Sequence, residues 1–191
     1  MSGQGKAEGE QSSLPQKKEP ASIDKSASPS GAQSPPLTII VSQATHSDIP
    51  DICALYKKVW DEHKGKIPAE FEKTWQPSPL EFTSQMEGVT FFAARKDKKL
   101  IGILGCAMAD GSARLVHIAV EPEHRKLGVG GALVASGIEW AKKSNASSIW
   151  TEPLTRFTHA IQLFKKLGFQ EAGIFHRHLW KEDVQILEIV F

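Results

Sequence analysis

The chain has 191 residues, and its 23 lysines and arginines almost balance its 22 aspartates and glutamates. A chain without an excess of one charge has no general affinity for nucleic acid or for an anionic membrane surface, so ligands must be recognised locally. Two cysteines, Cys53 and Cys106, are too few for a disulfide framework and favour a reducing compartment.

Residues 1–36 are rich in Ser, Gly, Pro and Lys, and Leu14 and Ile23 are their only large aliphatic side chains after Met1. Such a segment buries too little apolar surface to offset the entropy of ordering it. We therefore predict a disordered tail over 1–36 and one folded domain over 37–191. The chain shows no apolar signal segment and no run of about 18 apolar residues, so we expect a cytoplasmic protein.

The folded part is predicted to begin with a strand and a helix. Leu37–Val41 is a β-rich run, and the polar cluster Thr45–Asp48 offers N-caps for a helix. Apolar residues from Ile49 to Val59 then recur at helical spacing. Glycines and prolines interrupt residues 61–88, where Pro79–Met86 is a short amphipathic piece, so this stretch is predicted to be irregular.

Three strands are predicted to follow in succession. Val89–Ala94 and Leu100–Ala107 are apolar runs joined by the polar turn Lys96–Lys99. Ala113–Val120 follows the hairpin-type pair Asp110–Gly111 and ends before a proline. Short connections between successive strands predict an antiparallel meander.

Helices and strands alternate in the rest of the chain. Leu133–Ala141 has helical spacing, Ser147–Thr151 is a predicted strand, and the amphipathic helix His159–Leu167 is stopped by Gly168. The last two strands are predicted at Gly173–Trp180 and Val184–Val190. This order predicts an α/β (α+β) fold with a mixed sheet and helices on its faces.

Residues 120–131 join a predicted strand end to a helix start, and they contain three glycines within four positions. Glycine allows a backbone to approach a bulky anion, and the first N–H groups of a helix lack intrahelical partners. These donors and the positive end of the helix dipole suit a pyrophosphate, with Arg125 and Lys126 adding charge. A tight turn without a ligand also uses glycine, so the spacing alone leaves both interpretations open.

Two motifs resemble a known family. Arg125-x-x-Gly128-x-Gly130 is similar to the Arg/Gln-x-x-Gly-x-Gly/Ala signature of the GNAT family of N-acetyltransferases. Ala160–Phe169 resembles the family's Ala-Ile-x-Leu-Tyr-x-x-Leu-Gly-Phe segment at matching separation. The resemblance implies a mixed, mostly antiparallel twisted sheet of six to seven strands flanked by about four helices, over residues 37–191.

The resemblance also implies a site for acetyl-CoA. Backbone amides of Arg125–Gly131 would hold the pyrophosphate, and main-chain groups of Ile118 and Val120 would meet pantetheine where two strands splay. The Ile118 N–H would face the thioester carbonyl as an oxyanion donor. The implied cofactor residues are Ile118, Ala119, Val120, Arg125, Lys126, Leu127, Gly128, Val129, Gly130, Gly131, Phe157, Ala160 and Phe164.

Two positions depart from the family pattern. Phe164 stands where many relatives carry the tyrosine that protonates the leaving thiolate, and Tyr56 is the only tyrosine of the chain. Phe157 stands where many relatives carry an asparagine. The departure at Phe164 keeps open a catalytically weak CoA-binding regulatory or interaction module as the alternative to an active enzyme. The glycine spacing leaves a third interpretation, a turn that binds no ligand.

Three histidines and one carboxylate are candidates for chemistry. His117 precedes the implied oxyanion donor and is a candidate base, and Glu152 at a strand end is the next candidate; each also has an ordinary structural interpretation. His176 and His178 alternate on one face of a predicted strand, but no third ligand of suitable spacing lies near them, so we predict no metal site.

The resemblance implies that residues 60–86 shape the site that binds the acceptor. This stretch places Asp61, Glu62, Glu70, Glu72 and Glu81 among Trp60, Phe71, Trp75 and Phe82. Carboxylates beside aromatic rings suit a cationic amine, and they are equally typical of amphipathic helices. The resemblance implies acetyl transfer to a small-molecule or peptide amine that the sequence does not identify. We expect direct transfer in a ternary complex, because no cysteine is placed as an acyl carrier. The resemblance leaves a homodimer open.

Overall fold

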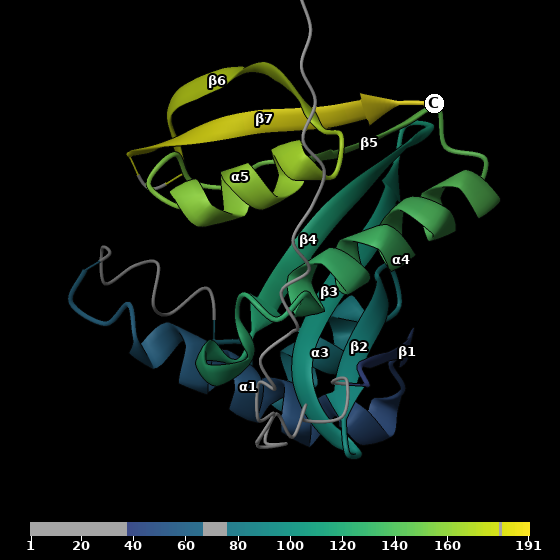
Figure 1. The fold of residues 1–191 in the computed structure, drawn as a ribbon, viewed down its shortest axis with the longest axis vertical. Helices are drawn as coiled ribbons and strands as arrows, with labels where there is room; N and C mark the ends of the chain where they lie inside the picture. The colour runs from purple at the N-terminus through teal and green to yellow at the C-terminus, as the bar shows by residue number, and fades with distance from the viewer. Residues whose placement is uncertain (1–37, 67–75, 180) are drawn as a thin grey trace, which may run out of the picture. The chain divides into compact units, whose positions relative to one another are not determined.

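Seven strands form one sheet in the order β1-β2-β3-β4-β5-β7-β6 in the computed structural model, which describes residues 38–66, 76–179 and 181–191 (Figure 1). The pair β4·β5 is parallel and the other neighbours are antiparallel. The strands are β1 Ile40–Gln43, β2 Thr90–Lys96, β3 Lys99–Ala109, β4 Ser112–Val120, β5 Ser148–Thr151, β6 Gln170–Leu179 and β7 Glu182–Val190. The predicted mixed, mostly antiparallel sheet is confirmed, whereas the predicted tail over 1–36 lies outside the described residues.

The described residues carry four α-helices and two short 3-10 helices. They are η1 His46–Asp48, α1 Ile49–Asp61, α3 Pro79–Gln85, η2 Pro122–His124, α4 Val129–Lys143 and α5 Thr158–Lys166. Local sequence explains their ends: Ser78 accepts a hydrogen bond from the Glu81 N–H at the start of α3, and Gly168 follows α5 with φ of 98°, as predicted. None of the described helices is long and apolar enough to cross a bilayer.

The strand β4 contains a bulge at the centre of the sheet. Gly105 of β3 pairs with Val116 of β4, and Ile103 of β3 pairs with Ala119 of β4. The step between these pairs is two residues along β3 but three along β4, so β4 holds one extra residue. His117 has φ of 54°, in the left-handed region. The bulge reverses which faces later side chains occupy, so that Leu115 and Ile118 both contact the core cluster that includes α4. The predicted strand Ala113–Val120 is therefore present, but its side chains do not alternate regularly at this point.

β4 and β5 are joined over a short distance. Their ladder consists of Ala113 opposite Ile149 and Arg114 opposite Trp150, after which β4 continues to Val120 without β5 beside it. The two strands diverge from this junction in Figure 1. The Thr151 hydroxyl donates a 3.3 Å hydrogen bond to the Leu115 carbonyl just past the ladder. The edge of β4 beyond Leu115 thus has main-chain groups that β5 does not pair.

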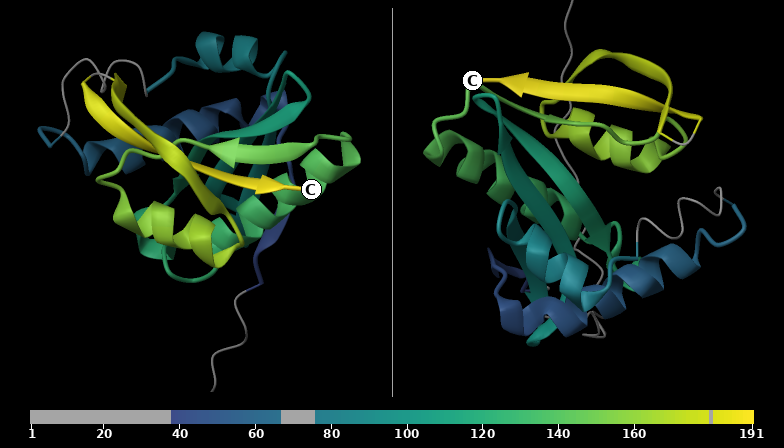
Figure 2. Two further views of the ribbon diagram at one scale, coloured as in Figure 1. Left: turned by 90° about the horizontal axis from the view of Figure 1, so that it is seen from above. Right: turned by 180° about the vertical axis from the view of Figure 1, so that it is seen from behind.

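The core lies on both faces of the sheet. One cluster packs α1 and α3 against the sheet through Ile52, Tyr56 and Phe82, and the other packs α4 and α5 through Leu133 and Phe164. The left view of Figure 2 shows these two helix layers on opposite sides of the strands. Amphipathic helices at each face remove both apolar surfaces of the central strands from water, which explains their nearly continuous apolar sequence.

Candidate functional site

The helix α4 begins with backbone donors that the helix itself does not use. Its N-cap is Gly128, with φ of 87°, and no side chain caps this end. The Ala132 N–H donates to the Gly128 carbonyl at 3.0 Å, which is the first bond of the helix. The N–H groups of Val129, Gly130 and Gly131 therefore lack partners within the helix, which is the arrangement that suits an anion; this helix start is here called the opening of α4.

The three glycines of this opening meet different structural requirements. Gly128 supplies the left-handed conformation. A Cβ on Gly130 would lie 2.9 Å from Leu163 Cδ2 of α5 and 3.9 Å from Val120 Cγ2, so Gly130 lets α4 approach both α5 and the end of β4. A Cβ on Gly131 would meet no atom within 4 Å. The structure thus brings the two family motifs together with the end of β4.

The residues preceding the glycines are turned outward. Arg125, Lys126 and Leu127 are exposed, and Lys126 has φ of 61°. The Arg125 N–H donates to the Pro122 carbonyl at 3.2 Å, so this amide is engaged, in contrast to its predicted role in holding pyrophosphate. The Arg125 guanidinium pairs with Glu62 at 2.7 Å and donates through Nε to the Val120 carbonyl at 3.2 Å. Its charge stays beside the opening, partly neutralised by Glu62.

A buried carboxylate lies at the start of this segment. Glu121 is 4% exposed, and its Oε1 accepts hydrogen bonds of 2.7 Å from Lys58 and from Lys99. Burial acts to raise the pKa of Glu121, but the hydrogen bonds and charges of the two lysines outweigh it and lower the pKa to about 2. Glu121, Glu123 and His124 place ligand atoms within 4.8 Å of one another, yet lysine amines bind both carboxylates, so the cluster is an ion-pair network.

The bulge of β4 places His117 among aromatic rings. Its ring centroid lies 6.1 Å from that of Tyr56, 6.2 Å from Phe82 and 5.7 Å from Phe91. The Tyr56 hydroxyl donates a 2.5 Å hydrogen bond to the His117 carbonyl. Burial raises the pKa of Tyr56 well above its usual value, so the phenol remains a donor. The backbone next to Ile118 is therefore fixed by a buried tyrosine.

Burial controls the protonation of His117. Desolvation, with a smaller contribution from the nearby Arg114 charge, lowers the pKa of His117 to about 4. The imidazole is neutral at physiological pH and can accept a proton, but a pKa this low makes it a weak base. The unfolded chain, with a histidine pKa of about 6.5, binds more protons than the folded chain between pH 6.5 and pH 4, so stability falls as the pH drops through this window.

His117→Asn is expected to reduce this acid sensitivity, because asparagine does not titrate and tolerates a positive φ. Urea unfolding at pH 7 and pH 4.5 should show that wild type loses about 2 kcal/mol more than the variant. The exposed His159 is the control position, and His159→Asn accounts for the loss of one histidine. Equal losses in wild type and His117→Asn would contradict the assigned burial of the imidazole.

The second candidate base, Glu152, is already paired. Its Oε1 forms an ion pair with Nη2 of Arg114, whose guanidinium carbon lies 5.0 Å from the centre of the Trp150 ring. These residues lie where β4 and β5 separate. Glu152 therefore contributes an ion pair at the junction of the two strands.

The three sequence-predicted residues of α5 have different surroundings. Phe157 is the N-cap, and its ring centroid lies 6.4 Å from Trp60 and 5.3 Å from His63. Ala160 is half-buried at the edge of the core. Phe164 is 1% exposed and packs edge-on against Phe169, with ring centroids 5.2 Å apart. A ring at position 164 thus belongs to the core of this structure.

The cofactor residues predicted on β4 differ in burial. Ala119 is buried and pairs with Ile103 of β3. Ile118 and Val120 are half-buried beside the α4 cluster, and the Val120 carbonyl accepts the Arg125 hydrogen bond. Ile118 lies in the bulge, where one-to-one pairing with β3 is lost. Among the main-chain groups predicted to contact the cofactor, that of Ile118 therefore depends most on the bulge for its position.

β6 does not keep the alternation predicted for His176 and His178. Its pairing with β7 is irregular between Phe175 and Leu179, and Arg177 has φ of 52°. His176 Nδ1 lies 3.1 Å from an oxygen of Asp183, and the His178 ring lies 5.1 Å from that of Phe175. The two histidines thus have separate neighbours.

The carboxylates predicted to face an amine already have partners where the structure describes them. Asp61 pairs with Lys57, Glu62 with Arg125, and Glu81 with its own capping serine. Phe82 is fully buried, and Trp60 is 8% exposed. These contacts match the amphipathic-helix interpretation. Glu70, Phe71, Glu72 and Trp75 lie outside the described residues.

Sequence reasoning did not assign Tyr56 or Lys58 of α1 to the site, and it gave Glu62 a role towards the acceptor and not towards Arg125. Tyr56 lies on the apolar stripe of its helix, and a buried tyrosine needs a hydrogen-bond partner, which is a signal that could have drawn attention to it. Lys58 and Glu62 look like ordinary surface charges, because their partners lie more than 60 residues later in the chain. Only the folded structure brings these charges together.

Comparison with known proteins gives a consistent assignment. The acetyltransferase (GNAT) family matches residues 52–169. The chain is 26% identical over 110 residues to human N-acetyltransferase 8B, covering 54% of this chain and 48% of that protein. It is 37% identical over 62 residues to the ribosomal protein bS18-alanine N-acetyltransferase of Escherichia coli, covering 32% of this chain and 42% of that protein. The chain spans about half the length of the human relatives it matches.

A solved structure shows the same fold. The paia N-acetyltransferase of Thermoplasma acidophilum in complex with coenzyme A matches with a TM-score of 0.68 at 17% identity, over 81% of this chain and 99% of that one. The family match covers more than half of the chain and includes β4, the glycine-lined opening of α4 and α5. The chain belongs to the GNAT family of acetyltransferases.

Proposed function

We propose that this protein is an acetyl-CoA-dependent N-acetyltransferase that moves an acetyl group directly to a primary amine within a ternary complex. The observation that carries the proposal is the uncapped start of α4, where the N–H groups of Val129, Gly130 and Gly131 lack helical partners. This opening lies beside the end of β4, whose edge is free of β5. Both features suit a long ligand that carries a diphosphate.

The donor set fits acetyl-CoA. The three N–H groups and the helix dipole would hold the pyrophosphate, with Lys126 and the partly neutralised Arg125 adding positive charge. Main-chain groups of Ile118 and Val120 would meet the pantetheine arm along the free edge of β4. Ala119, Leu127, Phe157, Ala160 and Phe164 remain predicted contacts.

When bound, acetyl-CoA supplies a thioester from which an acetyl group is transferred to the amine. The Ile118 N–H in the bulge is the proposed donor to the thioester carbonyl oxygen. His117 is the proposed base: it is neutral above about pH 4, and a proton taken from the amine would reside on its imidazole. Its low pKa limits this role and favours transfer of the proton onward to water.

The acceptor class is a primary amine. The Escherichia coli relative is named for acetylation of an alanine of a ribosomal protein, so a peptide with an N-terminal alanine is the first acceptor to test. We place the reaction in the cytoplasm, because Cys53 and Cys106 are free thiols.

One observation favours a second candidate, a CoA-binding module with little turnover. Phe164 occupies the position of the family's acid tyrosine, and its buried phenyl ring cannot donate a proton. A thiolate leaving group would then have to be protonated by water or by another residue. The two candidates share the cofactor site and differ in whether an amine is acetylated.

Thermal or urea unfolding with acetyl-CoA tests the shared cofactor site. A ligand at 100 times its dissociation constant should add about 2.7 kcal/mol to the free energy of unfolding. Release of free thiol is then followed with an alanine peptide, a lysine peptide and a polyamine. Release above the rate without amine supports the enzyme, whereas binding without release across the panel supports the module. A protein that acetyl-CoA does not stabilise would contradict both candidates.

A further inference from the structure

The segment Glu121–Gly128, here called the cofactor loop, connects β4 to α4. After Glu121, none of its residues is buried: Arg125 to Gly128 are exposed, and η2 contains no buried residue. Apolar burial therefore cannot hold the loop at one distance from the sheet. Its position must depend on polar contacts with neighbouring elements.

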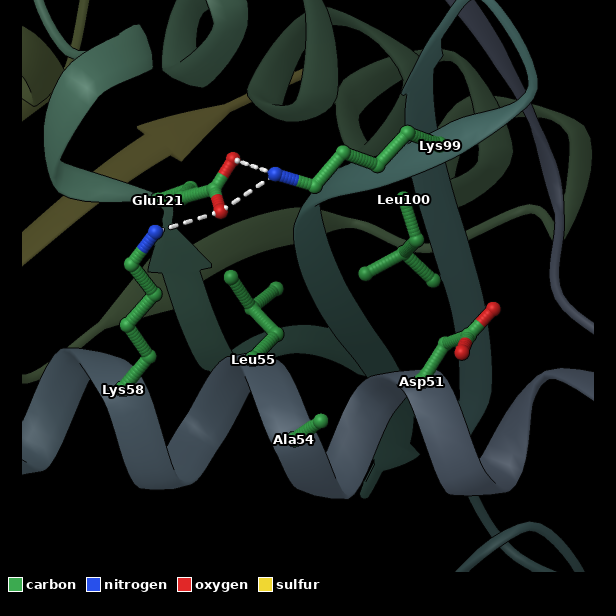
Figure 3. Close-up of a pocket in the computed structure, with 7 residues that line it drawn as sticks. All are labelled: Asp51, Ala54, Leu55, Lys58, Lys99, Leu100 and Glu121. Carbon is green, nitrogen blue, oxygen red and sulfur yellow. Dashed lines mark hydrogen bonds and ion pairs between the residues drawn. The ribbon is translucent and has the colours of Figure 1, made fainter.

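The first contact comes from Lys58 of α1. Its amine donates hydrogen bonds of 2.7 Å to Glu121 and to Glu123, at the beginning of the cofactor loop. Figure 3 shows Lys58 and Lys99 reaching Glu121 from opposite sides, from α1 and from the start of β3. They border a cavity of about 190 Å³ that Leu55 and Leu100 also line. A carboxylate as buried as Glu121 cannot leave these cations for water, so it fixes the start of the loop.

The second contact comes from Glu62, which follows the last residue of α1. It pairs with Arg125 at 2.7 Å, in the middle of the cofactor loop. Lys58 and Glu62 are four residues apart, so they lie on the same side of the helix. Along the helix the positive charge comes first and the negative charge second, whereas along the loop the carboxylates of Glu121 and Glu123 come before the guanidinium of Arg125. Each charge on the helix therefore faces an opposite charge on the loop. A shifted loop would bring like charges together.

We infer that Lys58 and Glu62 are positioning residues that hold the cofactor loop ready for its ligand; this inference rests on the proposed binding of acetyl-CoA. Both residues act through the loop and touch no reacting atom. A loop ordered before binding loses less conformational freedom when the ligand arrives. Acetyl-CoA affinity should therefore depend on two charges of a helix that lies on the other face of the sheet from α4.

The same helix provides a matched control. Lys57 and Asp61 form an ion pair of 2.7 Å next to Lys58 and Glu62, with side chains 68% and 47% exposed. This pair is made within α1 itself. The test protein is Lys58→Met/Glu62→Gln, and the control is Lys57→Met/Asp61→Asn. Each removes one lysine and one carboxylate from the same turns of the same helix.

Isothermal titration of the full chain with CoA measures the effect. The test variant should bind CoA at least about tenfold more weakly than wild type, and the control should bind as wild type does. With an active acceptor, the KM for acetyl-CoA should be higher in the test variant, and kcat should stay within about twofold of wild type. At saturating acetyl-CoA the bound ligand itself orders the loop. Lys58→Arg should retain affinity, because arginine keeps the positive charge.

Hydrogen exchange of the ligand-free proteins gives a readout that does not depend on the cofactor. Amides of residues 122–130 should exchange faster in the test variant than in the control, with no matching change in the strands. Equal CoA affinity and equal exchange in the two variants would overturn the inference. If wild type itself does not bind CoA, the proposed function fails, while the exchange experiment still decides whether Lys58 and Glu62 hold the loop.

Discussion

Valine in place of Gly128 is expected to abolish measurable binding of acetyl-CoA. Gly128 has φ of 87°, a conformation that costs other L-residues about 1–2 kcal/mol and is worst for β-branched ones. The chain would relax towards negative φ and turn the N–H groups of Val129, Gly130 and Gly131 away from the opening. Titration calorimetry should show an affinity loss of more than about 100-fold, which corresponds to about 2.7 kcal/mol.

Gly111 provides the control for backbone strain. It has φ of 82° in the turn between β3 and β4, and a side chain there, as at Gly128, would meet no atom within 4 Å. Gly111→Val should therefore cost a similar amount of stability at the opposite end of β4 and leave acetyl-CoA affinity unchanged. Similar affinities for Gly128→Val and wild type would show that the opening of α4 does not hold the cofactor.

Tyr56→Phe is expected to lower kcat by between about tenfold and 100-fold, once an acceptor is known. The substitution keeps the ring and removes the hydroxyl that donates to the His117 carbonyl at 2.5 Å. The bulge can then shift, and a catalytic donor displaced by as little as about 1 Å can lose about 100-fold in rate. CoA affinity should change much less than kcat, because the proposed pyrophosphate donors lie at the start of α4 and not in the bulge.

The loss of kcat in Tyr56→Phe can be assigned to the bulge only by comparison with a variant of similar stability. Val59 is buried on the same helix, and Val59→Ala also removes core contacts, without touching the hydrogen bond to β4. Steady-state kinetics and urea unfolding of the two variants should show comparable stability but a loss of kcat confined to Tyr56→Phe. A parallel loss of kcat in Val59→Ala would mean that general loosening of the core, rather than the position of the bulge, controls the rate.

The regular part of the fold could be predicted because it depends on local patterns. Helical spacing located α1 and α4, short polar turns predicted the meander, and Gly168 has the left-handed conformation expected after α5. These features follow from interactions within a few residues. The element order predicted from the sequence is accordingly the order in the structure.

The details of the site depend on contacts between distant segments, which local patterns do not contain. The bulge at His117 is stabilised by Tyr56, which lies 61 residues earlier. The pairing of Glu62 with Arg125, 63 residues apart, likewise became visible only when α1 packed on the sheet.

The short ladder between β4 and β5 has a mechanical consequence. A ladder of two residue pairs joins the strands β1–β4 to the strands β5–β7, and side chains add the Thr151 hydrogen bond, the Arg114–Glu152 ion pair and a hydrogen bond from Trp150 to Ser112. The helices α4 and α5 meet at Gly130 and Leu163. This seam has few bonds to resist a twisting motion between the two halves. A molecule lying along the free edge of β4 and against α5 would brace the seam, so ligand binding and the stiffness of the whole sheet are linked.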